Sequence, residues 1–189
     1  MKRKASYSVL VLLTIATLAC SGGGDAPSVT TPGPGGSFTA SFTADEPAPG
    51  NNTVNLSPAP GGGGNIVTVN VGVTGVNDVF GASFRLTYDP GVVTFENWSA
   101  GSFIEGSGNT VLYQVSVVTH GVVEVGASCA ACAVGENASG TETLIQLLFR
   151  TTAAGTSPVS FVASDLLNSQ SPPAPIGGLS WAGGTVVSQ

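Results

Sequence analysis

The sequence predicts an all-β fold, an antiparallel β-sandwich. From residue 52 onward, apolar side chains recur at every second position, which is the period of a strand with one buried face. The 189 residues include 27 glycines and 12 prolines, whereas only 8% are charged. This composition favours short strands joined by tight turns. Because periodicity does not separate a sandwich from a closed barrel, a barrel is the alternative.

Nine segments with this period follow one another along the chain. Turn-forming residues separate them, which indicates antiparallel neighbours. In chain order, strands are expected at residues 52–56, 65–75, 79–88, 92–96, 110–119, 121–128, 142–152, 157–164 and 179–189.

The segment 79–88 alternates most clearly. Its inward set is expected to be Phe80, Ala82, Phe84, Leu86 and Tyr88. Its outward set is Ser83, Arg85 and Thr87. Asp89-Pro90-Gly91 then forms a turn, because aspartate bonds local backbone and proline fixes φ. In two later segments the inward sets are expected to be Val111, Tyr113, Val115 and Val117, and Val159, Phe161 and Ala163.

Residues 1–19 resemble a bacterial lipoprotein signal peptide. A basic start, MKRK, precedes an apolar run that is shorter than the about 20 residues of a membrane span. Ala19 followed by Cys20 matches the position at which such a signal is cleaved and its cysteine lipidated. Ser21 is typical of outer-membrane delivery in Gram-negative bacteria. We therefore expect an envelope protein, at the outer membrane or cell surface, whose only membrane attachment is lipid on Cys20. An ordinary secretory signal is the alternative.

Residues 20–51 predict a flexible tether rich in glycine, proline, serine and threonine. This stretch lacks a hydrophobic period and cannot bury enough surface to offset its ordering entropy. A flexible chain of this length spans about 30 Å end to end. Residues 37–50 have a second interpretation, as an extended segment lying against the domain. The domain itself is assigned to residues 52–189.

The charge pattern excludes nucleic acid as a partner. The formal net charge is −6, and three of the five basic residues are Lys2, Arg3 and Lys4. The remaining chain has only Arg85 and Arg150 against eleven acidic residues. Such a surface repels phosphate backbones.

The residue inventory predicts no catalytic site, metal or cofactor. The single histidine, His120, precedes a glycine between two strands and is interpreted as a solvated turn residue. Ser116 and Glu124 are near it in sequence, but no nucleophile-elbow pattern accompanies them. Asn77 and Asp78 provide too few oxygen ligands for calcium, which takes six to eight.

Cys129 and Cys132 are separated by two residues, a spacing shared by redox pairs, half zinc sites and local disulfides. No helix is expected there to lower a thiol pKa. Zinc needs about four ligands, and one distant histidine does not complete the set. In an oxidising envelope, we expect a disulfide.

The segment VTVNVGVTGVNDVFGASFRLTYDPGVVTFENW resembles the opening of a cohesin domain. The match rests on a valine-rich strand, then Phe84 and Leu86 before Tyr88-Asp89-Pro90, then an apolar strand. TLIQLLFRTTAAGTSPVSF resembles a later pair of strands in that family. The resemblance covers about residues 52–187. It implies a nine-stranded jelly-roll sandwich, related to carbohydrate-binding modules, that binds dockerin modules in plant-polysaccharide degradation.

The leading functional hypothesis is a non-catalytic, surface-tethered module that docks a protein, either dockerin-like or another envelope or extracellular protein. Ser83, Arg85 and Thr87 are candidate contacts, because the resemblance implies docking through this outward sheet face. Trp98 is a further candidate, since it is the aromatic residue best placed for exposure. The alternative is a polysaccharide-binding module, which requires an exposed row of tryptophan or tyrosine.

Overall fold

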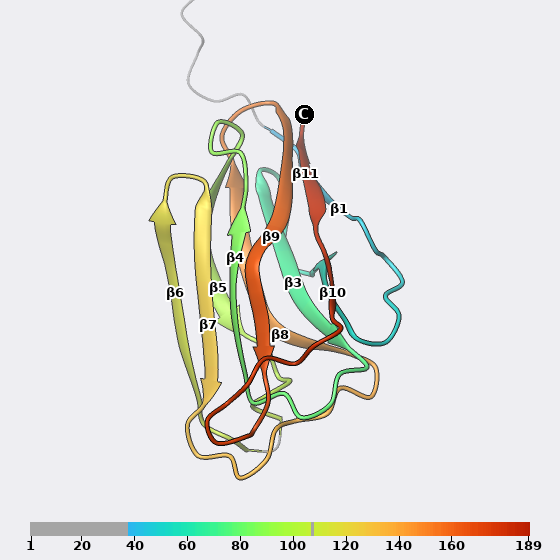
Figure 1. The fold of residues 1–189 in the computed structure, drawn as a ribbon. Helices are drawn as coiled ribbons and strands as arrows, with labels where there is room; N and C mark the ends of the chain where they lie inside the picture. Colours follow the sequence, from blue (N-terminus) through green and yellow to red (C-terminus); the bar gives the residue numbers. More distant parts are fainter. Residues whose placement is uncertain (1–37, 107) are drawn as a thin grey trace, which may run out of the picture. The chain divides into compact units, whose positions relative to one another are not determined.

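The computed structural model describes residues 38–106 and 108–189. Two β-sheets pack face to face, which excludes the closed barrel (Figure 1). The strands are β1 (Ala40–Ala44), β2 (Thr53–Pro58), β3 (Ile66–Thr74), β4 (Gly81–Thr87), β5 (Val93–Ala100), β6 (Val111–Thr119), β7 (Val122–Cys129), β8 (Thr141–Thr151), β9 (Gly155–Leu167), β10 (Ser180–Ala182) and β11 (Gly184–Ser188). The expected signal peptide, Cys20 and the first part of the expected tether lie outside the described residues.

The two sheets contain six and five strands. The six-stranded sheet has the order β1-β11-β9-β4-β7-β6, and the five-stranded sheet has the order β10-β2-β3-β8-β5. Neighbouring strands run antiparallel, except that β10 runs parallel to β2. The chain changes sheet repeatedly between successive strands, as in a jelly roll. The described residues contain no helix long and apolar enough to cross a membrane.

The core lies between the sheets, and the expected alternation in β3, β4 and β8 is confirmed. The fully buried aromatic ring of Phe84 packs against Phe161 and Trp181, at centroid distances of 5.5 and 6.3 Å. The side chains that alternate with the core point outward, so Ser83 and Arg85 are exposed. The buried members of these three strands are Val67, Val69, Val71, Val73, Ala82, Phe84, Leu86, Ile145, Leu147 and Phe149.

The sandwich has eleven strands rather than the nine expected. One reason is that the last expected segment, residues 179–189, forms two strands in different sheets, β10 and β11. The chain crosses between the sheets at Gly183. A Cβ at this position would collide with the carbonyl oxygen of Val159, so the crossing requires the close backbone approach that glycine allows.

The other reason is β1, which lies inside the range assigned to the tether. It pairs antiparallel with β11, and Phe42 is buried in the core. The Thr39 N–H donates to the Gln189 carbonyl at 2.7 Å, and the Gln189 N–H donates back at 3.1 Å. The ordered domain therefore begins before residue 52, and an extended segment against the domain is the correct interpretation for Ala40–Ala44.

Two expected inward positions are also wrong. Ala163 is exposed with φ of 49°, because β9 bulges where its register with β4 shifts between Ser83 and Arg85. Leu166, beyond the bulge, is buried in its place. Val117 is 48% exposed because β6 forms an edge of its sheet, where no further strand covers it.

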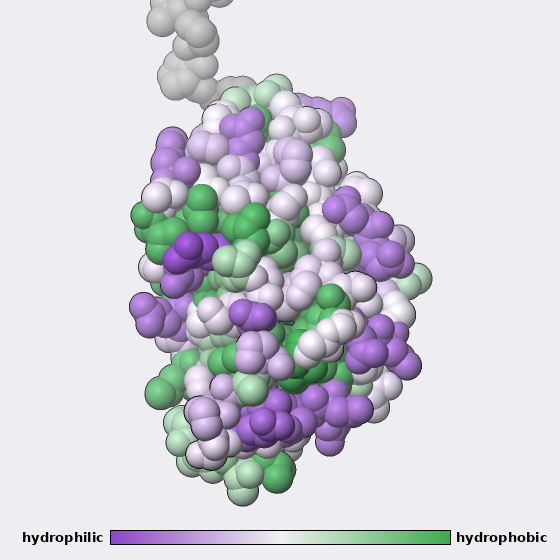
Figure 2. Space-filling model, in the orientation of Figure 1, coloured by the Kyte–Doolittle hydropathy of each residue, from purple (hydrophilic) through white to green (hydrophobic). Residues whose placement is uncertain are grey.

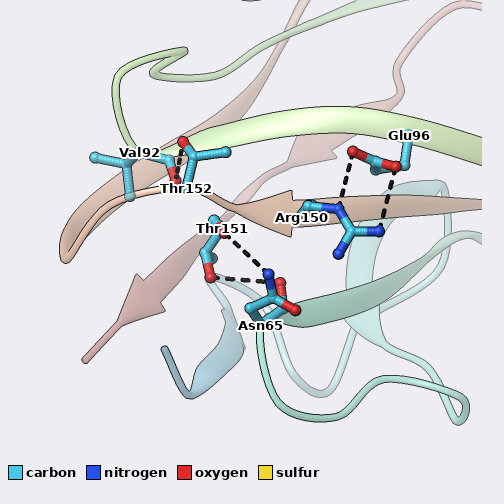
Figure 3. Close-up of polar contacts among 6 residues, drawn as sticks. All are labelled: Asn65, Val92, Glu96, Arg150, Thr151 and Thr152. Atoms are coloured by element: carbon cyan, nitrogen blue, oxygen red, sulfur yellow. Dashed lines mark hydrogen bonds and ion pairs between the residues drawn. The ribbon is translucent and has the colours of Figure 1, made fainter. Parts of the chain in front are cut away.

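Polar contacts fasten the end of β8 to its neighbours (Figure 3). The Asn65 side-chain amide donates to the Thr151 carbonyl at 3.4 Å, and the Thr151 hydroxyl donates to the Asn65 carbonyl at 3.3 Å. The Thr152 hydroxyl donates to the carbonyl of Val92, just before β5, at 3.3 Å. These bonds satisfy backbone groups where the regular ladder ends.

Candidate functional site

The outward residues of β4 lie at the centre of the outer face of the six-stranded sheet, the face toward the viewer in Figures 1 and 2. Side chains directly opposite each other on antiparallel strands share a face, so the register defines this surface. Ser83, Arg85 and Thr87 lie opposite Gly126, Glu124 and Val122 of β7. On the other side they lie opposite Asp165, Val162 and Ser160 of β9.

Arg85 is held in the middle of this face by an ion pair with Glu124. The Arg85 Nε donates to Glu124 Oε2 at 2.7 Å, and the two side chains are 49% and 38% exposed. A pair this exposed contributes about 0–1 kcal/mol, because water screens both charges. The pair orients the guanidinium of a half-exposed side chain but adds little to stability.

The second arginine of the domain, Arg150, has the same type of pairing on the opposite sheet. The Arg150 Nε lies 3.1 Å from Glu96 Oε1, across β8 and β5 (Figure 3). Arg150 is 43% exposed, close to the value for Arg85. The two arginines therefore form a matched pair on opposite outer faces of the sandwich.

The candidate face also contains a hollow of about 360 Å³ beside the edge strand β6. Gly126 lies in its floor, and the absence of a side chain there deepens it. Leu112 and Leu167 line it, and Leu112 is 64% exposed. Leu112 was not among the contact residues predicted from the sequence. Its signal was the adjacent pair Val111-Leu112, because two consecutive apolar residues in a strand put one on each face.

Trp98 does not join this face. It lies on β5, in the five-stranded sheet, and is half-buried. Its ring packs at 5.3 Å from that of Tyr113 on β6, so the two rings close the gap between the edges of the sheets. The Tyr113 hydroxyl donates to the Leu144 carbonyl at 3.3 Å, and burial raises the pKa of Tyr113 to about 12.

The other aromatic side chains bear on the polysaccharide alternative. Within residues 38–106 and 108–189, every aromatic side chain is buried or half-buried. The exposed row of tryptophan or tyrosine that this alternative requires is therefore not formed by the described residues.

The residues considered for catalysis and metal binding either have other partners or lie away from one another. His120 is exposed in the turn between β6 and β7, and the Glu124 carboxylate pairs with Arg85. Asp78 accepts hydrogen bonds from the backbone N–H groups of Gly135, at 3.0 Å, and Ser169, at 3.3 Å. Hydrogen bonds with Ser169 and Gly135 lower the pKa of Asp78. No group of three histidine, cysteine or acidic side chains suited to a metal occurs in the described part of the chain.

Cys129, at the end of β7, forms a disulfide with Cys132, and their Cα atoms are 5.7 Å apart. Cys129 is buried and Cys132 is half-buried. The bridge closes the first turn of the loop that leads to β8. Cys20, the expected lipidation site, lies outside the described residues.

These features define a β-sandwich module whose six-stranded sheet presents a broad, exposed outer face with an arginine near its centre. The cohesin domain family model matches residues 53–170, more than half of the chain. The chain therefore belongs to the cohesin domain family, as its strand pattern indicated. A comparison with curated proteins finds no match.

Solved structures support the fold. The sixth cohesin of scaffoldin B from Acetivibrio cellulolyticus, solved in complex with a Cel5 dockerin mutant, has 20% identity and a TM-score of 0.52, covering 70% of this chain and 95% of that one. A type II cohesin from the cellulosome of the same organism has 16% identity and a TM-score of 0.54, covering 80% and 95%. The type II cohesin dyad of its ScaA scaffoldin has 17% identity and a TM-score of 0.58, covering 72% and 48%.

Proposed function

We propose that this protein is a non-catalytic docking module that binds a protein partner through the outer face of β9, β4, β7 and β6. The observation that carries the proposal is an arginine held at the centre of a broad, exposed sheet face. A broad, open sheet face suits a protein surface better than a small molecule, which is usually enclosed in a concave pocket. Arginine is enriched among the residues that dominate binding energy at such interfaces.

The proposed partner is a dockerin-like module or another envelope or extracellular protein. Membership of the cohesin family supports this choice, and so does the A. cellulolyticus cohesin that was solved with a dockerin. Ser83 and Thr87, which flank Arg85 on β4, are the proposed neighbouring contacts. Trp98 is left out of the proposed face because it lies on the other sheet.

We also propose that lipid on Cys20 anchors the module to the envelope, at the outer membrane or cell surface. The support is the sequence of residues 1–21, with a basic start, a short apolar run and Ala19-Cys20-Ser21. In this arrangement the residues between Cys20 and β1 connect the anchor to the domain. We further propose that the anchored module assembles proteins that degrade polysaccharides.

The test compares Arg85 with its matched counterpart on the opposite sheet. The full chain with a C-terminal affinity tag is used to capture proteins from a detergent extract of the envelope, and the captured protein is then titrated. Arg85→Ala is expected to weaken binding by about 30-fold, the equivalent of a 2 kcal/mol hot spot. Arg150→Ala, which breaks a similarly exposed ion pair, should leave affinity unchanged.

Two results would contradict the proposal. Equal binding by Arg85→Ala and the unsubstituted chain would remove the face that we assign to docking. Retention of the chain on cellulose or another insoluble glycan, without capture of any protein, would favour the polysaccharide alternative instead.

A further inference from the structure

Each sheet of the sandwich has two edges, and the four edge strands differ in how they are protected. They are β1 and β6 in one sheet, and β10 and β5 in the other. The outer side of an edge strand presents backbone N–H and C=O groups that its own sheet does not pair. Proteins usually protect such edges with short strands, charges, prolines or bulges.

Three edges have such protection. β10 contains three residues and β1 contains five, so both are short. β5 has eight residues, but it contains Glu96, paired with Arg150, and a bulge between Phe95 and Asn97. Each of these edges offers a poor template for another strand.

β6 is the exception. Its nine residues, VLYQVSVVT, contain no charge, proline or glycine. Its register with β7 is regular from Val111 to Val117 and shifts only at the end of the strand, between Val117 and Thr119. Of the five large apolar side chains exposed in the described part of the chain, three lie on β6: Leu112, Val117 and Val118. Figure 2 shows one group of hydrophobic side chains on the upper left of the face, over β6 and β7, and a second group to the right of the centre. A long, uncharged, apolar edge is the type that pairs with another chain.

We propose that β6 pairs antiparallel with β6 of a second copy of this chain, about a two-fold axis near Val115. Directly opposite residues of an antiparallel pair share a face, so the axis stands perpendicular to the sheet and passes midway between the two copies of one residue. Because none of the nine residues is charged, no like charges meet in any register that centres the axis on the strand.

The positions of the other elements favour a second copy as the partner. None of the nine residues of β6 is charged, so an uncharged, apolar strand matches this edge better than a charged one. The second copy supplies a strand with the same length and chemistry. β1, the first strand of the described domain, lies at the edge opposite to β6, so it stays at the two outer edges of the paired sheets and does not obstruct the pairing.

This pairing joins two six-stranded sheets into one continuous sheet. Because the axis is perpendicular to the sheet, both outer faces, each with its own Arg85, point to the same side. Two docking faces on one side allow two linked partner modules to bind at once, which raises apparent affinity without new contacts. The pairing itself does not depend on the identity of the partner.

The test places a lysine at each edge of the six-stranded sheet in the full chain, solubilised in detergent. Gln114→Lys adds a charge on the outward side of β6, opposite Gly126, and Thr43→Lys adds the same charge on the outward side of β1. Across the two-fold axis, the two lysines at position 114 would be diagonal neighbours about 7–8 Å apart and repel each other. The mass of each variant is measured by analytical ultracentrifugation over a hundredfold range of concentration.

We expect concentration-dependent dimers for the unsubstituted chain and for Thr43→Lys, and a dimer dissociation constant at least tenfold higher for Gln114→Lys. Amide hydrogen exchange on the unsubstituted chain should show protection of residues 111–117 that increases with concentration. Monomers at every concentration, equal dimerisation by both variants, or exchange in β6 that does not depend on concentration would each overturn the proposal. Neither measurement requires a docking partner. The pairing of β6 can therefore be refuted without affecting the proposed docking function, and the reverse also holds.

Discussion

Phe84 and Arg85 are consecutive residues on opposite sides of β4, and replacing each with alanine tests the register on which the docking face depends. Phe84 is fully buried, and its ring contacts those of Phe161 and Trp181. Arg85 is half exposed and paired with Glu124 on the outer face. The two substitutions should therefore have opposite effects on stability and on binding.

The magnitudes follow from burial. Removing a fully buried phenylalanine costs about 3–5 kcal/mol, because apolar contacts are lost and a cavity remains between tightly packed rings. Removing a half-exposed arginine from a screened ion pair costs about 0–1 kcal/mol. For a domain of this size, Phe84→Ala should lower the melting temperature by about 10–15 °C, and Arg85→Ala by no more than about 3 °C.

The assay is thermal unfolding of the full chain, followed by near-ultraviolet circular dichroism and tryptophan fluorescence. Trp181 lies 6.3 Å from Phe84 and should report the loss of packing directly. Binding of a captured partner should be weakened by Arg85→Ala at temperatures where the variant is folded. Phe84→Ala should lose binding only as it unfolds. If Arg85→Ala destabilises the chain as much as Phe84→Ala, the register of β4 is wrong and the proposed face is refuted.

Three further predictions concern the cysteines and Tyr113. A palmitate analogue should label the protein in cells, and Cys20→Ser should abolish the label; an unlabelled, freely soluble periplasmic product would contradict the anchor. Mass spectrometry of non-reduced peptides should find Cys129 linked to Cys132, and replacing both with alanine should cost about 2 kcal/mol because the closed loop is short; two free thiols would count against the bridge. Absorbance titration should show one tyrosine ionising near pH 12, absent in Tyr113→Phe. Since the unfolded residue ionises near pH 10, neutral Tyr113 contributes to the free energy of unfolding below that pH, and this contribution is lost between about pH 10 and 12. An absorbance titration curve that Tyr113→Phe leaves unchanged would contradict the raised pKa of Tyr113.

The sequence predicted the inner faces of the strands well because side chains alternate between the two sides of a strand. In β4, every residue expected to face inward between Ala82 and Tyr88 is buried. This information is local, so one segment is enough to read it. The family resemblance extended it to the order of the strands, which periodicity alone does not provide.

The predictions from sequence were wrong or incomplete where pairing between distant segments determines secondary structure or the direction of a side chain. Phe42 lies in a segment rich in small and polar residues, and its strand exists because β11, more than 140 residues later, provides an edge to pair with. Ala163 is in phase with Phe161, but a bulge against β4 turns it outward. Trp98 shows the same limit, since its partner Tyr113 lies on the other sheet. None of these contacts can be predicted from the residues next to each position in the sequence.

The outer face is harder to predict than the core for a further physical reason. A core position is fixed by burial, which favours apolar side chains, whereas an outward position of a solvated sheet tolerates most residues. The sequence therefore indicated that Arg85 points outward, but not that Glu124, 39 residues later, fixes its direction. It also did not indicate that Gly126 opens a hollow beside Leu112. These properties depend on which strands are neighbours. For this reason, a docking surface on a sandwich can be assigned only when register, side-chain exposure and ion pairing are considered together, and the contrast between Arg85 and Arg150 is the sharpest test that the chain offers.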